Sequence, residues 1–292
     1  MDMQGRQAIE TLVTNRREAY ETITVTSLTP LIGAEIEGLD LSQVLSNHQF
    51  AEVRRAFLEH HVLVFRDQNL SAEDHKRFGR RFGKLHVHAL QALREGDNER
   101  LEVRATKNSK YVAGEDWHTD VTCDEEPPLG SMLYITETPE IGCGGDTLFA
   151  NMYLAYDMLS EAMKAFLGGL TAVHDGAIPY VGSYGYKPDQ PFNKTEHPVV
   201  IRHPETGRQV LFVNRGFTSH IVQLSRPESA AVLEMLYRVV EANPVVTCRV
   251  RWTPNTLVFW DNRCTQHHAL WDYFPLSRSG HRVSIIGERP QA

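Results

Sequence analysis

The sequence has few of the features that would place it in a membrane or outside the cell. Apolar runs such as Leu63-Val64-Phe65 are far shorter than the roughly 20 residues needed to cross a bilayer. The first residues, Met1 to Arg6, contain no apolar core of an export signal. The 292 residues include only 4 cysteines and no Cys-x-x-Cys pair, which predicts reduced thiols rather than a disulfide framework. We therefore expect a cytoplasmic protein without a membrane partner.

The sequence also contains fewer basic than acidic residues. Lys and Arg number 30 against 37 Asp and Glu, so the formal net charge is −7 at pH 7. Nucleic-acid-binding domains usually carry a basic excess, so we expect no nucleic-acid partner. Gly/Ser linkers, Pro-rich stretches and internal repeats are missing as well. The content of 41% hydrophobic and 23% charged residues is typical of a folded globular chain and excludes wholesale disorder.

The length alone allows one domain or two, because ~150 residues is a typical domain but single β domains reach ~250. Since no linker divides the chain, we interpret residues 1–292 as a single domain. Residues 1–20 form a polar leader, either frayed or folded as a short helix. Residues 175–196 are rich in Gly, Pro and Tyr and show no periodicity, which predicts an active-site loop.

Strands dominate the second part of the chain. Helical spacing of apolar residues predicts helices at 46–61, 71–83, 160–167 and 227–242. Alternating or continuous apolar runs predict strands at 23–26, 34–37, 62–65, 101–105, 131–136, 147–150, 199–203, 210–213, 247–252, 256–260 and 283–287. The predicted fold class is mainly β with flanking helices, a sandwich or a jelly roll.

A candidate metal site begins at Trp117-His118-Thr119-Asp120. An imidazole and a carboxylate two residues apart on extended backbone point to the same side. Two histidines and one carboxylate on one face form the ligand set of non-haem iron enzymes, which leaves coordination positions open for substrates. Most isolated His-x-Asp pairs are surface residues, so this pair alone is weak evidence for a metal site. A metal site requires a third ligand from another part of the chain.

The third ligand has two candidates. The segment Asp261 to His268 follows an apolar strand and ends in His267 and His268. Adjacent residues of a strand point to opposite faces, so at most one of them can join the pair at His118 and Asp120. Spacing does not choose between them. Either would meet His118 only if the sheet folds back on itself, as it does in a jelly roll.

The chain resembles a known family through several separated motifs. They are Trp117–Thr122, Gly144-Gly145-Asp146-Thr147, Trp260–His267 and His281-Arg282. In this order they are similar to the taurine dioxygenase or TfdA-like family of Fe(II)- and 2-oxoglutarate-dependent dioxygenases, which includes the phenoxyalkanoate herbicide dioxygenases. The resemblance covers roughly residues 22–290. It implies a double-stranded β-helix (jelly roll), and it implies Fe(II), 2-oxoglutarate and O2 as cofactor and cosubstrates.

The resemblance also implies roles for the metal-site residues. His118, Asp120 and His267 correspond to the iron ligands of the family, so they are the candidate catalytic and metal-binding residues. His268 then occupies the position after the ligand. By the same resemblance, the enzyme hydroxylates an aliphatic carbon of a small anionic substrate. A taurine-like organosulfonate would then release sulfite.

Binding residues follow by the same correspondence. Thr147 and Arg278 match the residues that hold the far carboxylate of 2-oxoglutarate. Arg282 and His88 match those that hold the substrate anion, and Phe217 matches an apolar wall of the pocket. Taken without the resemblance, Arg278 and Arg282 would be read as surface arginines beside a C-terminal strand.

Departures from the family concern the end of the pocket that receives the taurine amine. Gln91 stands where taurine dioxygenases have a tyrosine, and Gly114 lies near the position of an asparagine. The aromatic residue expected around His174-Asp175-Gly176 is missing. An aryloxy- or alkyl-carboxylate is therefore the alternative substrate class. An alternative of another class is a zinc-dependent hydrolase on the same fold. A homo-oligomer is expected because most soluble enzymes form one.

Overall fold

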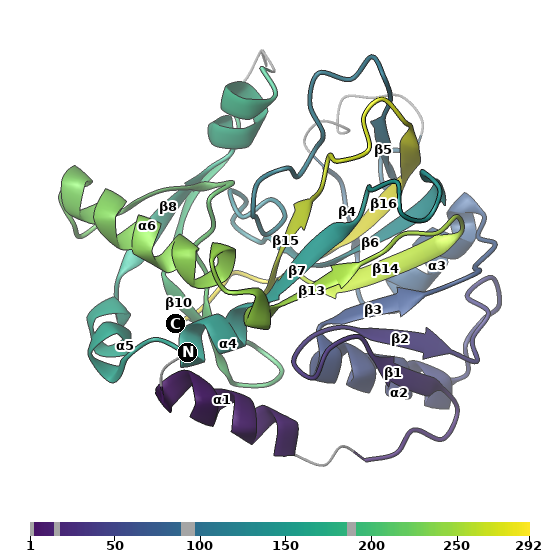
Figure 1. Cartoon of the computed structure of the whole chain (residues 1–292), viewed down its shortest axis with the longest axis horizontal. Helices are drawn as coiled ribbons and strands as arrows, with labels where there is room; N and C mark the ends of the chain where they lie inside the picture. Colours follow the sequence, from purple (N-terminus) through teal and green to yellow (C-terminus); the bar gives the residue numbers. More distant parts are fainter. Residues whose placement is uncertain (1–2, 15–17, 89–96, 186–190) are drawn as a thin grey trace.

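The computed structural model describes residues 3–14, 18–88, 97–185 and 191–292. Its largest sheet, here called the main sheet, runs through the right half of the molecule in Figure 1. In spatial order its strands are β1 (Thr24–Ser27), β2 (Ala34–Glu37), β3 (Val62–Phe65), β14 (Thr256–Asp261), β6 (Pro128–Glu137), β16 (Arg278–Ile286) and β4 (Leu85–His86), with β5 (Leu101–Ala105) also paired to β16. All pairs are antiparallel except β2 with β3.

A smaller sheet faces the main sheet. It consists of β13 (Thr247–Val250), β7 (Thr147–Asn151) and β15 (Thr265–Ala269). Phe149 of β7 and Val250 of β13 share one buried cluster with Val258 and Trp260 of β14. The alternate residues Leu257 and Phe259 face the opposite side of β14, because successive side chains of a strand point to opposite faces. The two facing sheets form the predicted double-stranded β-helix.

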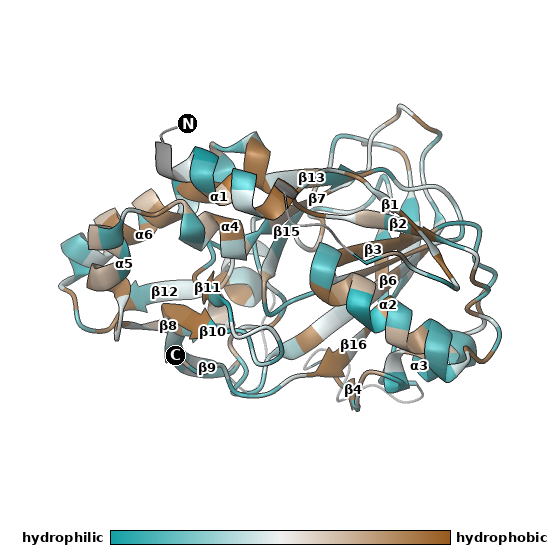
Figure 2. Ribbon diagram, turned by 90° about the horizontal axis from the view of Figure 1, so that it is seen from below, coloured by the Kyte–Doolittle hydropathy of each residue, from teal (hydrophilic) through white to brown (hydrophobic). Residues whose placement is uncertain are grey.

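Helices cover the outer face of the main sheet. They are α2 (Asn47–His60) and α3 (Ala72–Arg80), and each starts at a serine, Ser46 or Ser71, whose side chain forms a reciprocal capping box. Phe57 of α2 stacks on Phe259 of β14 with ring centroids 4.0 Å apart. Figure 2 shows hydrophobic β3 beneath the more hydrophilic surface of α2. The main sheet is therefore buried on both faces.

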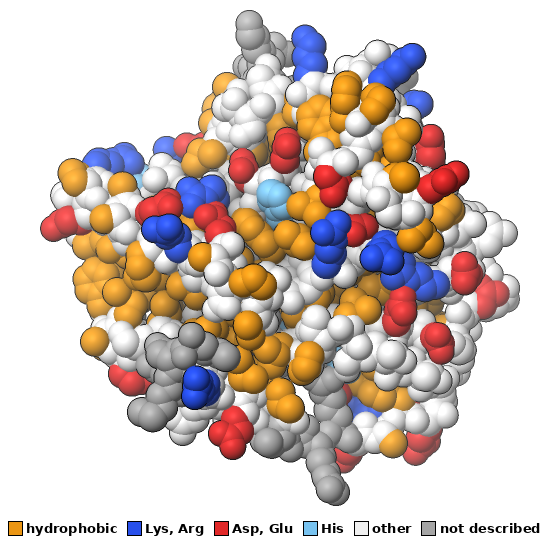
Figure 3. All heavy atoms as spheres, viewed as in Figure 1, with side chains coloured by type: hydrophobic (Ala, Val, Ile, Leu, Met, Phe, Trp, Pro, Cys, Tyr) orange, Lys and Arg blue, Asp and Glu red, His pale blue; other side chains and the backbone are white. Residues whose placement is uncertain are grey.

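A further layer lies on the left in Figure 1. It contains the sheet β12–β8–β9, the hairpin β10–β11 and helices that pack around a third apolar cluster. Its elements are α4 (Met152–Asp157), α5 (Glu161–Leu167), β8 (Thr171–Asp175), η1 (Ile178–Ser183), β9 (Lys194–Pro198), β10 (Val200–Arg202), β11 (Gln209–Leu211), β12 (Thr218–Ile221), α6 (Arg226–Glu241) and η2 (Pro244–Val246). Figure 3 shows acidic and basic side chains interspersed over one face of the molecule.

Several predicted elements differ from the observed ones. Part of the leader is helical, as α1 (Met3–Thr14), and its Ile9 and Leu12 pack against Leu154. Strand β16 begins at Arg278 rather than at 283, so both C-terminal arginines belong to the strand itself. Residues 175–196 are not irregular throughout, since they contain the π-helix η1 and the start of β9. Their glycines and prolines hide any periodicity. Among the described residues, no helix is both long and apolar enough to cross a membrane.

Candidate active site

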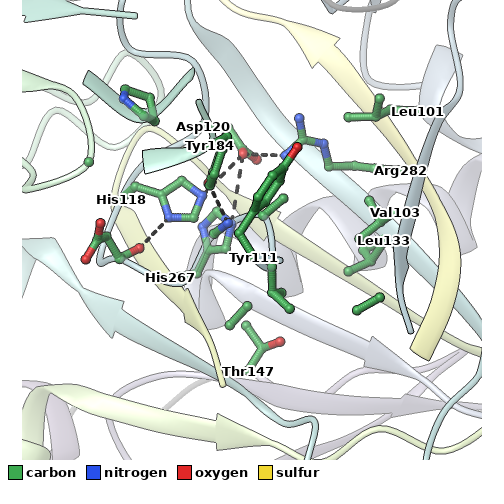
Figure 4. Close-up of a pocket in the computed structure, with 18 of the residues that line it drawn as sticks. Leu101, Val103, Tyr111, His118, Asp120, Leu133, Thr147, Tyr184, His267 and Arg282 are labelled. Atoms are coloured by element: carbon green, nitrogen blue, oxygen red, sulfur yellow. Dashed lines mark hydrogen bonds and ion pairs between the residues drawn. The ribbon is translucent and has the colours of Figure 1, made fainter. Parts of the chain in front are cut away.

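A backbone bridge brings the first and last motifs together. The main-chain N–H of His118 donates to the carbonyl of His267 at 3.0 Å, and the N–H of His267 donates back to His118 at 2.8 Å. Residues paired in this way lie directly opposite and project to the same side. Thr119 points the other way, where its hydroxyl donates to the carbonyl of Thr265. Asp120 follows on the side of the two histidines, as Figure 4 shows.

The three side chains form a compact donor set. The Nε2 atoms of His118 and His267 lie 3.7 and 3.9 Å from Asp120 Oδ1, and all three donor atoms lie within 4.8 Å of one another. His118 Nδ1 donates to the carbonyl of Asp116 at 2.7 Å, which orients the ring so that Nε2 faces Asp120. Burial and the nearby His118 hold the pKa of His267 well below its usual range, so this imidazole is neutral. Neutral imidazoles and a carboxylate are the forms that bind a divalent metal, so these residues fit one.

His268 faces away from this donor set. Its ring lies against Trp117, with centroids 5.6 Å apart. Strand alternation therefore separates the two adjacent histidines as expected, and the structure brings His267, not His268, to His118 and Asp120.

The Asp120 carboxylate is held by other residues as well. Arg282 Nη1 donates to Oδ1 at 2.5 Å, and the Ser131 hydroxyl donates to Oδ2 at 2.7 Å. Asn262 in turn donates to Ser131 Oγ at 3.1 Å. Burial by itself would raise the pKa of Asp120, but Arg282 and the two histidines outweigh it and hold the pKa well below its usual value. Asp120 is therefore a fixed anion.

Arg278 is a buried cation. Its side chain is only 4% exposed, and among the described residues no carboxylate lies within ion-pair distance of it. Its guanidinium lies 5.1 Å from the Trp252 ring centre and donates weakly to Thr147 Oγ1 at 3.4 Å. Burial lowers the pKa of Arg278, with Tyr273 acting in the opposite direction. A buried guanidinium in this position provides a binding site for an anionic group.

One cavity of about 300 Å³ connects these groups. Arg278 and Arg282 are four residues apart on β16, so both project from the same face into it. Apolar side chains, Leu133 among them, flank Arg282 across the sheet. All of the residues that the sequence predicts for the site line this cavity: His88, His118, Asp120, Thr147, Phe217, His267, Arg278 and Arg282.

Sequence reasoning missed the aromatic side chains that close the cavity. Tyr180 and Tyr184 come from η1 and its end, and Tyr111 stacks on Tyr184 with centroids 4.7 Å apart. Their segments show no periodicity, so no signal marked them. At Gly114, a Cβ would lie 2.9 Å from His118 Cε1, so any larger side chain there would crowd the His118 ring. Gln91 lies outside the described residues.

A second cluster of possible metal donors is already satisfied internally. His203, Asp261 and Cys264 also lie close together. His203 Nδ1 accepts from the backbone N–H groups of Glu205 and Thr206, so its Nε2–H donates to Asp261 at 3.2 Å. The carboxylate is also bound by Arg263. This cluster is an ion-pair network rather than an open metal site.

The comparison with family models decides the family. Residues 24–284 match the model described as "Taurine catabolism dioxygenase TauD, TfdA family". The chain belongs to this family. The predicted enzyme class, an oxidoreductase of the 2-oxoglutarate-dependent dioxygenase type, is therefore confirmed, and so is the jelly-roll fold.

Individual relatives are similar over most of their length. An alpha-ketoglutarate-dependent sulfonate dioxygenase of Saccharomyces cerevisiae is 34% identical, over 94% of this chain and 69% of its own. An alkylsulfatase of Acinetobacter baylyi is 36% identical, over 89% of this chain and 84% of its own. The crystal structure of a taurine dioxygenase from Burkholderia xenovorans superposes with a TM-score of 0.80 at 36% identity, covering 92% of this chain and 91% of that one.

Proposed function

We propose that this dioxygenase uses Fe(II), 2-oxoglutarate and O2 to hydroxylate an aliphatic carbon of a small anionic substrate, a taurine-like organosulfonate. The main support is one arrangement: two histidines and a carboxylate converge in a cavity that also contains the buried guanidinium of Arg278, which pairs with no carboxylate of the described residues. A metal-binding set and an anion site in one cavity match a cosubstrate that binds through both of its ends.

His118, Asp120 and His267 would hold the iron. When bound, Fe(II) supplies the activation of O2 that the oxidative decarboxylation of 2-oxoglutarate and the hydroxylation require. Ser131 and Arg282 keep the Asp120 carboxylate ionised and oriented. The protein thus contributes a preorganised set of donors rather than the oxidation chemistry itself.

The anion sites would divide the two substrates between them. Arg278 and Thr147 bind the far carboxylate of 2-oxoglutarate, because the guanidinium fork matches a carboxylate. Arg282, His88 and Phe217 line the part of the cavity that receives the substrate. Arg282 gives one N–H to Asp120, and a guanidinium has five, so donors remain for a second anion.

A sulfonate is the preferred substrate class because relatives named for sulfonate and alkyl sulfate chemistry match this chain along most of its length. One O2 and one 2-oxoglutarate are consumed per turnover. One oxygen atom enters succinate, which forms with CO2, and the other becomes the new hydroxyl group. A hydroxyl on the carbon that bears the sulfonate then expels sulfite and leaves an aldehyde.

The experiment is a substrate panel on the Fe(II)-loaded enzyme. Taurine, alkanesulfonates, alkyl sulfates and phenoxyacetate are each supplied with 2-oxoglutarate and air. Succinate is measured for every substrate, together with sulfite from the sulfonates and inorganic sulfate from the alkyl sulfates. Sulfite equal to succinate with a sulfonate supports the proposal, whereas turnover of alkyl sulfates alone, with sulfate equal to succinate, would show a sulfate ester to be the substrate. Substrate-dependent succinate with phenoxyacetate alone would show the carboxylate alternative to be right. Conversion of a substrate without O2 or 2-oxoglutarate would instead show a hydrolase.

A further inference from the structure

The π-helix η1 places a tyrosine beside the predicted substrate residues. Tyr180 is 7% exposed and lines the cavity, although it comes from the segment between β8 and β9. Its hydroxyl lies 2.9 Å from His88 Nε2. π-Helical turns are rare and are frequent at functional sites. The hydroxyl therefore shares the substrate part of the cavity with His88 and Arg282.

Packing fixes the Tyr180 ring in place. The ring lies 4.5 Å from Phe192 and 6.0 Å from Phe217, measured between centroids. Gly176 makes room for this arrangement, because a Cβ there would lie 2.8 Å from Phe192 Cβ. Tyr180 thus places an aromatic ring with a hydroxyl group in the cavity, next in the chain to the segment 174–176 where the sequence lacks an aromatic residue.

Both partners of this hydrogen bond are uncharged. Burial raises the pKa of Tyr180 well above its usual value, so the phenol keeps its proton. Burial, with Arg282 as the next cause, lowers the pKa of His88 to about 3. Arg282 lines the same cavity as His88 and Tyr180. This end of the cavity offers one positive charge and neutral donors, which suits a singly charged head group.

We propose that Tyr180 is a specificity-determining residue that donates its phenolic hydrogen to the head group of the substrate. In this arrangement His88 Nε2–H donates to the phenol oxygen, so the Tyr180 hydrogen is directed into the cavity. Arg282 binds two oxygens of the head group and Tyr180 binds a third. A sulfonate or sulfate has three such oxygens and a carboxylate has two, so only the tetrahedral head group uses all the donors. This inference rests on the proposed function.

The test compares a matched pair of anions on the anaerobic enzyme loaded with Fe(II) and 2-oxoglutarate. Butanesulfonate and pentanoate have similar bodies, and their binding is measured by calorimetry. The wild type is expected to prefer butanesulfonate. Tyr180→Phe, which keeps the ring, should weaken butanesulfonate binding by about 10- to 100-fold, because a hydrogen bond to an ion is lost. Pentanoate binding should hardly change. In turnover the KM for the sulfonate should rise far more than kcat falls.

Controls separate the hydroxyl from general effects of substitution. Tyr153→Phe removes another buried phenol, whose hydroxyl bonds Thr206 Oγ1 at 2.9 Å outside the cavity, and should leave both affinities unchanged. His88→Gln should weaken sulfonate binding in the same direction as Tyr180→Phe, and it replaces that variant if the latter does not fold. Equal sulfonate affinity in Tyr180→Phe and wild type would refute the inference. No visible absorption band on anaerobic addition of Fe(II) and 2-oxoglutarate to the wild type would overturn the proposed function as well.

Discussion

At the scale of single residues, Arg278 tests the 2-oxoglutarate assignment most directly. The guanidinium is buried, without a carboxylate partner in the described part of the chain, and its role as an anion site predicts a large loss when it is removed. Arg278→Ala should weaken 2-oxoglutarate binding by roughly 2–4 kcal/mol, as expected for a buried charge-assisted pair. The measurement is an anaerobic titration of the Fe(II) enzyme with 2-oxoglutarate, followed by its visible absorption. Arg289→Ala, which removes an exposed arginine paired with Glu125, is the control. An unaltered affinity of Arg278→Ala for 2-oxoglutarate would show that Arg278 does not bind this cosubstrate.

Asp120 is the second residue whose removal gives a clear readout. Asp120→Ala should abolish stoichiometric Fe(II) binding, because it removes the anionic ligand and leaves two neutral imidazoles. The substitution also removes the carboxylate that pairs with Arg282. Equilibrium dialysis with Fe(II) under anaerobic conditions measures the binding. His268→Ala is the matched control, since His268 lies next to the proposed ligand but faces Trp117. Stoichiometric iron in Asp120→Ala would contradict the proposed ligand set.

At the scale of elements, local sequence patterns predicted where helices begin better than they predicted which strands pair. The helix starts at Ser46 and Ser71 follow from local capping chemistry and are confirmed. The pairing of His118 with His267 depends on a bridge between segments 149 positions apart, which no local pattern encodes. Family resemblance, not periodicity, selected His267 over His268. Tyr180 was missed because a π-helix has no familiar apolar spacing.

Gly114 lies in the turn next to the candidate metal site, and a substitution there tests whether this turn must leave room for the His118 ring. Gly114→Ala should weaken Fe(II) binding by about tenfold, because its Cβ would approach His118 Cε1 to 2.9 Å. The substitution also adds backbone strain at a φ of +87°, of order 1 kcal/mol. Gly142→Ala has similar strain at +93° but meets nothing within 4 Å. Thermal unfolding and Fe(II) dialysis of both variants separate the two effects. Equal iron affinity in both would show that Gly114 is needed only for its backbone.

At the scale of the whole molecule, the fold class and the family are confirmed, whereas the homo-oligomer and the cytoplasmic location stay predictions. The composition predicted a globular chain without specifying how its layers join. That joining depends on buried polar residues whose partners are not specified by any local sequence pattern. Asp261 at the end of β14 is the main example, since it contacts both His203, which follows β10, and Arg263, which precedes β15.

Asp261 should make the stability of the molecule sensitive to acid. Burial would raise its pKa, but Arg263 and His203 lower it below the usual value for an aspartate. A carboxyl with a lower pKa in the folded state stabilises the fold above its unfolded pKa of about 4, and this contribution is lost as the pH falls further.

Asp261→Asn should therefore lower the free energy of unfolding by about 3 kcal/mol at pH 7, because Arg263 loses a buried partner. The difference from wild type should shrink below about pH 4. Urea unfolding of both proteins at several pH values measures it, with Glu234→Gln at an exposed ion pair as a control that should change stability by less than about 1 kcal/mol. A pH-independent difference would mean that Asp261 acts through packing rather than through its charge.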